Sequence, residues 1–140
     1  MPFNFLRKKP QLRYVTSGAI KVTNRSAQVY VGCTKPVTVR ANNRLVLNTG
    51  LHINVPTNCI VVVQLNPGIT VSRGVHQQFM EILPGGFAGE VRIHMQNSTD
   101  RDYRINHKDL IANLHLIGDA QFTQCSSLKD VDPVAYSVGD

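Results

Sequence analysis

Short segments in which apolar and polar residues alternate recur along the first half of the chain. The clearest of them are residues 19–23, 27–31, 36–40 and 51–55, with turn-forming residues between them. Alternation places successive side chains on opposite faces of a strand, and short strands divided by turns are typical of sandwiches and barrels. The pattern therefore predicts an all-β fold.

A glycine-rich segment lies between two strongly apolar runs in the middle of the chain. The runs are residues 59–64 and 91–96, and the segment between them contains Gly85, Gly86, Phe87 and Gly89. Glycine permits positive φ and tight chain reversal, and alternating flanks present one apolar face. We therefore expect a β-hairpin at this place.

Residues 106–117 are open to two interpretations. Leu110, Ile111 and Leu114 have the spacing of a helical stripe, but the length and apolar content of the segment also suit a strand. The pattern by itself leaves both open. Nowhere else do ten or more residues hold a convincing helical stripe.

Five segments follow one another in a recognisable order: RLVLNTGL at 44–51, PG at 67–68, GGFAGE at 85–90, NSTDR at 97–101 and DLIANL at 109–114. This order resembles the trimeric dUTP pyrophosphatases (dUTPases) over residues 19–117. The resemblance implies a dUTPase-like distorted β-barrel or jelly-roll, assembled as a homotrimer with exchanged C-terminal segments. It also makes residues 106–109 a turn and residues 110–117 a strand.

The resemblance places different residues at several positions that carry chemistry in the family. Tyr30 and Pro84 stand where the family has aspartates, and residues 65–68 lack the arginine and serine that grip phosphate. The family's phosphate-closing C-terminal motif has no counterpart in residues 126–140. A positioned carboxylate contributes orders of magnitude to a hydrolytic rate. We therefore expect that the chain is not an enzyme, with no catalytic residue, metal site or cofactor.

The resemblance nevertheless leaves a vestigial nucleotide pocket. Its residues are Gly85, Gly86, Phe87, Gly89 and Asn113. Phe87 stands where the family has a tyrosine under the deoxyribose, and Asn113 stands where it has a glutamine. An aromatic residue in a hairpin is more often part of the core, so that alternative stays open for Phe87.

Two carboxylates flank the glycine-rich segment. Glu90 matches a glutamate at the end of the family motif, where it looks structural, and Glu81 lies three positions before Pro84 on an expected strand edge. We expect neither to be catalytic. The five histidines show no metal-ligand spacing with cysteines or carboxylates.

Charge divides the chain sharply. Residues 1–80 contain ten Lys or Arg and no Asp or Glu, whereas all nine acidic residues lie at or after Glu81. Four of the basic residues, Arg7, Lys8, Lys9 and Arg13, define a basic arm at residues 1–14 that suits nucleic acid or another acidic surface. Solvated surface charge is the alternative. The 140 residues suit one domain, a barrel at 15–118, with this arm and a tail at 119–140.

Other features of the sequence indicate an intracellular location. No apolar stretch is long enough to span a membrane, and no apolar core follows the N-terminal basic residues as a secretory signal requires. Cys33, Cys59 and Cys125 are odd in number and widely spaced, which favours reduced thiols. We expect an intracellular protein, or one carried in a virion.

Three functions fit these observations. The first is a non-enzymatic interaction or regulatory protein, similar to the dUTPase-derived viral proteins of the adenoviral early-region-4 type, with a host or viral protein as partner. The second is a structural virion or assembly component that uses the trimer and the basic arm. The third is a divergent active dUTP pyrophosphatase.

Overall fold

The computed structural model describes residues 9–138 and consists mainly of strands. Two five-stranded sheets and one two-stranded ribbon are formed. The first sheet has the order β12 (Gln121–Gln124), β1 (Gln11–Thr16), β5 (Arg44–Asn54), β9 (Ala88–Asn97), β7 (Val75–Gln77). The second has the order β2 (Ala19–Val22), β3 (Ser26–Tyr30), β11 (Leu110–Ile117), β6 (Ile60–Leu65), β8 (Glu81–Leu83). The ribbon pairs β4 (Val37–Val39) with β10 (Tyr103–Ile105).

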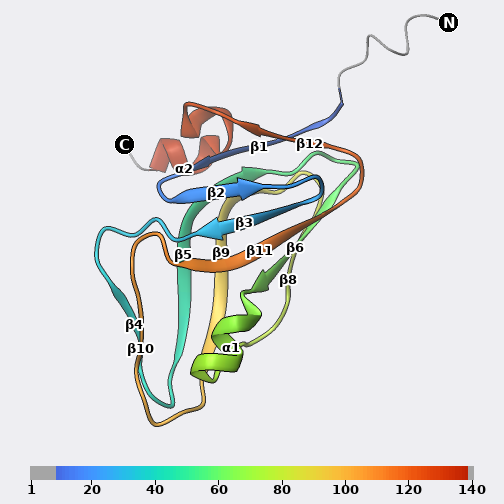
Figure 1. Cartoon of the computed structure of the whole chain (residues 1–140). Helices are drawn as coiled ribbons and strands as arrows, with labels where there is room; N and C mark the ends of the chain where they lie inside the picture. The colour runs from blue at the N-terminus through green and yellow to red at the C-terminus, as the bar shows by residue number, and fades with distance from the viewer. Residues whose placement is uncertain (1–8, 139–140) are drawn as a thin grey trace, which may run out of the picture.

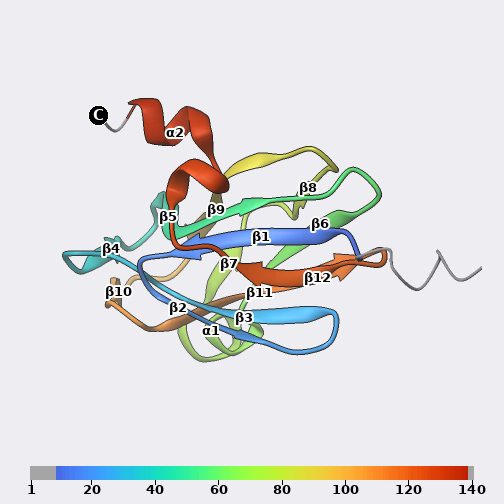
Figure 2. The same cartoon turned by 90° about the horizontal axis from the view of Figure 1, so that it is seen from above.

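The two long strands β5 and β9 pair antiparallel and run through the length of the molecule (Figure 1). The β4–β10 ribbon extends at one end, and the C-terminal helix α2 (Pro133–Val138) lies on another side, as the view from above shows (Figure 2). The all-β prediction is confirmed. The strand interpretation of residues 110–117 is also confirmed, because they form β11 between β3 and β6.

The core follows from strand alternation. On β9, Val91, Ile93 and Met95 are fully buried, while Arg92 between them is exposed. On β11, Ile111, Leu114 and Leu116 are buried in the same way. Burying each such side chain contributes roughly 1.5–3 kcal/mol. One continuous apolar core between the sheets therefore holds the fold together.

Strand β5 bends at Gly50. Its φ is +80°, and the pairing with β9 shifts register between Asn48 and His52. The buried Thr49 hydroxyl donates to the Val91 carbonyl at 2.7 Å, which fixes the irregularity. A sequence with Thr49-Gly50 at this point predicts such a kink, and the structure places it inside one continuous strand.

The expected hairpin is wrong in one respect. Residues 59–64 and 91–96 do not pair with each other, because β6 pairs with β8 and β11 whereas β9 pairs with β5 and β7. The chain does reverse at residues 84–87, where the Phe87 amide donates to the Pro84 carbonyl at 3.0 Å. That turn carries it from the second sheet to the first. Glycine-rich reversal was readable from the sequence, but the change of sheet depends on long-range pairing.

A short helix, α1 (Pro67–Arg73), follows β6. Asn66 caps it through a side-chain oxygen that accepts from the Gly68 amide at 3.1 Å, and Pro67 suits the first turn because its missing N–H needs no partner there. Gly74 ends the helix with a left-handed φ of +68°. With only seven residues, α1 is too short to give a recognisable helical stripe.

The expected domain boundaries differ from the structure at both ends. The barrel begins at Gln11 rather than after residue 14, since Leu12 and Tyr14 on β1 are buried in the core. Beyond residue 118, β12 runs parallel to β1 and closes one side of the first sheet. Residues 11–14 and the start of the tail are therefore parts of the barrel.

The C-terminal segment is fastened to the same chain by buried polar contacts. Asp132, 4% exposed, lies 3.1 Å from Nδ1 of His52, and the Asn54 amide donates to the Val131 carbonyl at 3.1 Å. A 3₁₀ turn at Leu128–Asp130 lies directly before these two anchoring residues, and helix α2 lies directly after them. Exchange of this segment between subunits stays a prediction.

All three cysteines are free. Cys59 is buried, and its burial, with the nearby Asp119 carboxylate adding to the effect, raises the pKa of its thiol. Cys33 and Cys125 are partly exposed. Over the described part of the chain, no helix has the length and apolar character that a membrane crossing requires.

Candidate functional site

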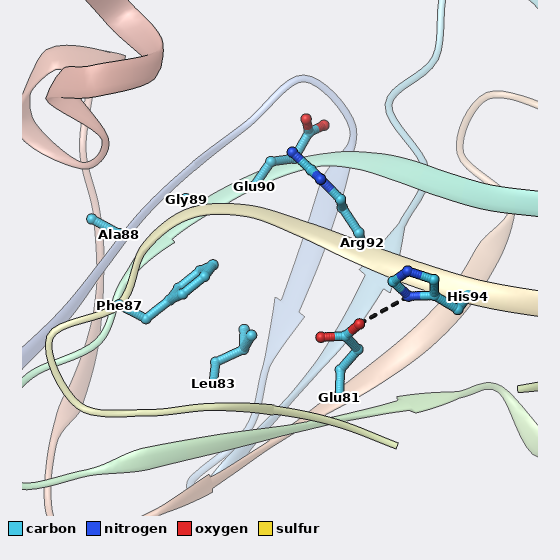
Figure 3. Close-up of a pocket in the computed structure, with 8 residues that line it drawn as sticks. All are labelled: Glu81, Leu83, Phe87, Ala88, Gly89, Glu90, Arg92 and His94. Atoms are coloured by element: carbon cyan, nitrogen blue, oxygen red, sulfur yellow. Dashed lines mark ion pairs between the residues drawn. The ribbon is translucent and has the colours of Figure 1, made fainter. Parts of the chain in front are cut away.

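A pocket of about 390 Å³ lies where β8 and the following turn fold over β9. It contains apolar and charged side chains together (Figure 3). The lining residues are Glu81, Leu83, Phe87, Ala88, Gly89, Glu90, Arg92 and His94. Every one of them comes from the segment 81–94, which also contains the glycine-rich stretch of the sequence.

Strand alternation positions the polar side of the pocket. Because Val91, Ile93 and Met95 face the core, Arg92 and His94 must face away from it. Their neighbours across the pairing on β5 are Asn48 and Val46. Arg92 and His94 therefore occupy successive outward-facing positions on β9.

Glu81 reaches this face from the other sheet. Its Oε1 lies 2.9 Å from Nδ1 of His94, and the two side chains are 22% and 28% exposed (Figure 3). Phe79, just before β8, packs on the imidazole with ring centroids 4.6 Å apart. The histidine is therefore held between an aromatic ring and a carboxylate.

The apolar side of the pocket is built by the turn. Gly86 adopts a φ of +88°, which glycine tolerates and other residues rarely adopt. The Phe87 ring packs against the core and is half-buried. A Cβ at Gly89 would lie 2.9 Å from the tip of that ring, so glycine is needed there for Phe87 to keep its place.

Glu90 has a structural role, as its position in the sequence indicated. One oxygen of its carboxylate accepts from the Gly50 amide at 3.0 Å. This contact joins the pocket strand β9 to the kink of β5. Two sequence segments of the family resemblance, 44–51 and 85–90, are thereby in direct contact.

The structure brings together only some of the residues predicted for the nucleotide pocket. Phe87 and Gly89 line it, Gly86 forms the turn beside it, and Gly85 lies in a separate hollow against Thr57. Asn113 is on β11, opposite Gln28 and Gln64, and does not line the pocket. A role for Asn113 at this site of the same chain is not supported by its placement.

Sequence reasoning missed three residues of the pocket. Arg92 and His94 were read only as parts of an apolar run, and Glu81 as a strand-edge carboxylate. The signal that could have found Arg92 and His94 was their period-two spacing opposite Val91 and Ile93. The approach of Glu81 to His94 had no local signal, because it depends on the change of sheet after β8.

Arg73 is the cation nearest in sequence to residues 65–68, and it does not line this pocket. It ends α1, with its guanidinium 5.6 Å from the centre of the Tyr103 ring. Burial raises the pKa of Tyr103, with Asp109 adding to the rise and Arg73 opposing it. This contact belongs to a hollow between α1 and residues 99–103, which shares no lining residue with the pocket on β8 and β9.

The basic arm is only partly described. Arg7 and Lys8 lie outside the described residues. Lys9 forms an exposed ion pair with Asp119, N to O 3.5 Å, and Arg13 is an exposed residue of β1. Lys9 and Arg13 are thus surface groups of the barrel, and binding of nucleic acid or an acidic surface through this region stays a prediction. Among residues 9–138, no group of three or more His, Cys, Asp or Glu side chains is placed to hold a metal ion.

Comparison with known proteins shows which proteins share this fold. No protein-family model matches the chain. The deoxyuridine 5'-triphosphate nucleotidohydrolase of Kluyveromyces lactis is 26% identical over 138 residues, which span 94% of this chain and 90% of that protein. The dUTPase of phage phi11 of S. aureus has the same fold, with a TM-score of 0.66 at 12% identity over 76% of this chain and 89% of that one.

A mutant of the Staphylococcus bacteriophage 80alpha dUTPase with dUpNHpp gives a TM-score of 0.66 at 13% identity, with the same coverage of both chains. The chain therefore has a dUTPase-like fold and resembles a dUTPase in sequence along most of its length. The comparisons do not bear on a likeness to viral proteins of the adenoviral early-region-4 type.

The prediction that the chain is not an enzyme is wrong. The relative matched over nearly the whole chain is a nucleotidohydrolase, and the solved structures of the same fold are dUTPases. That prediction rested on aligning single positions such as Tyr30 and Pro84. It overlooked that a folded pocket can draw an acid, an imidazole and a guanidinium from other positions, as this pocket does.

Proposed function

We propose that the protein is a divergent dUTP pyrophosphatase whose substrate site is the pocket between β8 and β9. The carrying observation is that this pocket lies on the glycine-rich segment that resembles dUTPases and contains Glu81, Arg92 and His94 together. Support also comes from the sequence similarity to the Kluyveromyces lactis deoxyuridine 5'-triphosphate nucleotidohydrolase, which extends over 94% of the chain.

The two sides of the pocket suit the two parts of a nucleotide. Phe87 and Leu83 offer an apolar wall for sugar or base, since an aromatic ring stacks on such groups favourably. Arg92 is exposed and presents a guanidinium to the pocket, the side chain best suited to phosphate oxygens. The substrate is expected as its magnesium complex, with the ion held mainly by phosphate oxygens and water.

Arg92→Ala tests the proposal. The wild-type chain is expected to release pyrophosphate from dUTP with magnesium, and the variant to lose roughly 100-fold in kcat/KM, because a guanidinium on developing phosphate charge acts mainly in the transition state. Arg104→Ala on β10 is the matched control, since Arg104 is also an exposed mid-strand arginine but lies outside the pocket. Absence of pyrophosphate release by the wild type, or equal rates for both variants and the wild type, contradicts the proposal.

We further propose that the chain forms a homotrimer in which a neighbouring copy covers apolar residues at the rim of the pocket. Phe79, Met80 and Ile82 are 52%, 57% and 57% exposed, and they flank Glu81. Single apolar residues are common on protein surfaces, whereas a cluster of three large ones is typical of a surface that a partner covers. A regulatory role with a host or viral protein stays a prediction. It is worth testing because phage dUTPases of the same fold are described as controlling the transfer of virulence genes.

Light scattering tests the assembly. The wild type is expected at three times the mass of one chain, and the Phe79→Ser, Met80→Ser double variant at lower mass, because burying these side chains favours association. Val71→Ser is the control, since Val71 is 87% exposed on α1 and lies away from this rim. A monomeric wild type, or a trimer unaffected by the double change, would refute this arrangement.

A further inference from the structure

The Glu81–His94 contact has features that plain packing does not require. Nδ1 of His94 is buried and 2.9 Å from Oε1 of Glu81, yet it has no aligned hydrogen-bond partner. A buried polar atom without a hydrogen bond is costly, and such atoms call for a specific explanation. Because the distance is already that of a hydrogen bond, a small rotation of either side chain would align the pair.

The carboxylate fixes which nitrogen of His94 carries the proton. An N–H at Nδ1 is attracted to Glu81, so the neutral imidazole keeps its free electron pair on Nε2. Since Nδ1 is the buried nitrogen and the side chain is 28% exposed, the exposed part lies on the rest of the ring. A carboxylate behind one nitrogen and a free pair on the other is the arrangement of a general base.

The surroundings favour this use of the imidazole. Phe79 packs against the ring and limits its rotation. Arg92 lies two residues earlier on the same face of β9, where a phosphate group would be held beside the histidine. The other charged or titratable groups near this face are Glu90 on β9, Arg44 and His52 on β5 and His76 on β7. Arg44 and His76 are both paired with Gln96, and His52 is paired with Glu90.

We propose that His94 is the general base of the hydrolysis and that Glu81 is the residue that positions it. The inference rests on the proposed function. His94 takes a proton from a water molecule while the water oxygen bonds to the α-phosphorus of dUTP. The bond from that phosphorus to the α,β-bridging oxygen breaks, and its electron pair leaves with pyrophosphate. The products are dUMP and pyrophosphate, and the imidazolium then returns its proton to solvent.

The test measures kcat, KM and their pH dependence for His94→Gln and Glu81→Gln with magnesium and dUTP. We expect kcat to fall by roughly 10²–10⁴ in His94→Gln, and by a smaller factor in Glu81→Gln, with KM within about threefold of the wild type. The pH dependence of kcat is expected to differ between the wild type and His94→Gln, because a glutamine side chain cannot act as the proton acceptor.

His76→Gln is the matched control, because His76 is an exposed histidine of the adjacent strand β7 that does not line the pocket. Its kcat and pH profile are expected to match the wild type. Binding of α,β-imido dUTP, measured by calorimetry, checks that each variant keeps a folded site. If His94→Gln fails to bind it, His94→Asn replaces it in the same measurements.

The outcomes separate the two proposals. A wild type that releases no pyrophosphate overturns the proposed function and the general base with it. A wild type that is active, with His94 variants that bind the analogue and keep its rate and pH profile, overturns the general base alone. A His94 or Glu81 variant that loses thermal stability but keeps the wild-type kcat would show that the Glu81–His94 contact only stabilises the packing of β8 against β9, and would also overturn the general base.

Discussion

Gly18→Ala is expected to lower the free energy of unfolding by about 3 kcal/mol, a large fraction of the stability of a typical domain. A Cβ at Gly18 would lie 2.2 Å from the Tyr30 carbonyl oxygen and 2.7 Å from the Gly32 nitrogen. Both are backbone atoms, so no side-chain rotation relieves the overlap. Urea unfolding followed by circular dichroism measures the effect.

Gly68→Ala is the control for this change. The nearest atoms to a Cβ at Gly68 belong to the Asn66 side chain, the closest at 3.4 Å, and the residue is in α1. Alanine favours a helix over glycine by roughly 0.8–1 kcal/mol, so this variant should be at least as stable as the wild type. Equal stability of the Gly18 and Gly68 variants would mean that the backbone at Gly18 approaches the backbone of residues 30–32 less closely than described.

Asn97→Leu is expected to lower the free energy of unfolding by about 2–4 kcal/mol, because it leaves buried backbone groups without partners. Asn97 is fully buried at the end of β9. Its amide donates to the carbonyls of Val39 and Arg101 at 3.0 and 2.7 Å, and its oxygen accepts from the Thr99 amide at 3.0 Å. One side chain thus joins the pocket strand to the β4–β10 ribbon.

Thermal and urea unfolding of Asn97→Leu beside Asn58→Ala measures this contribution. Asn58 is exposed, its side-chain amide donates to the Asp119 carbonyl at 3.3 Å, and its side-chain oxygen accepts from the Cys59 thiol at 3.5 Å. Its loss should change stability by less than about 0.5 kcal/mol. A loss of similar size in both variants would show that the backbone groups bonded to Asn97 find water instead.

The pocket shows how far the sequence could lead. Phe87 and Gly89 both line it, and the sequence indicated their proximity because a glycine-rich turn with an aromatic residue is a local feature. Asn113 was placed there by resemblance alone, and it lies instead on the middle strand of the second sheet. Arg92 and His94 were hidden in an apolar run until the burial of Val91 and Ile93 fixed which face of β9 is outside.

The sequence by itself determined the local conformations. Alternation, β-branched runs and turn residues fixed the strands, the reversal at 84–87 and the kink at Gly50, because backbone sterics and side-chain periodicity act over a few residues. Only the tertiary structure decided that β8 and β9 belong to different sheets. Glu81 and His94 are paired by that choice, since which strands pair depends on burial across the whole chain and not on any segment of it.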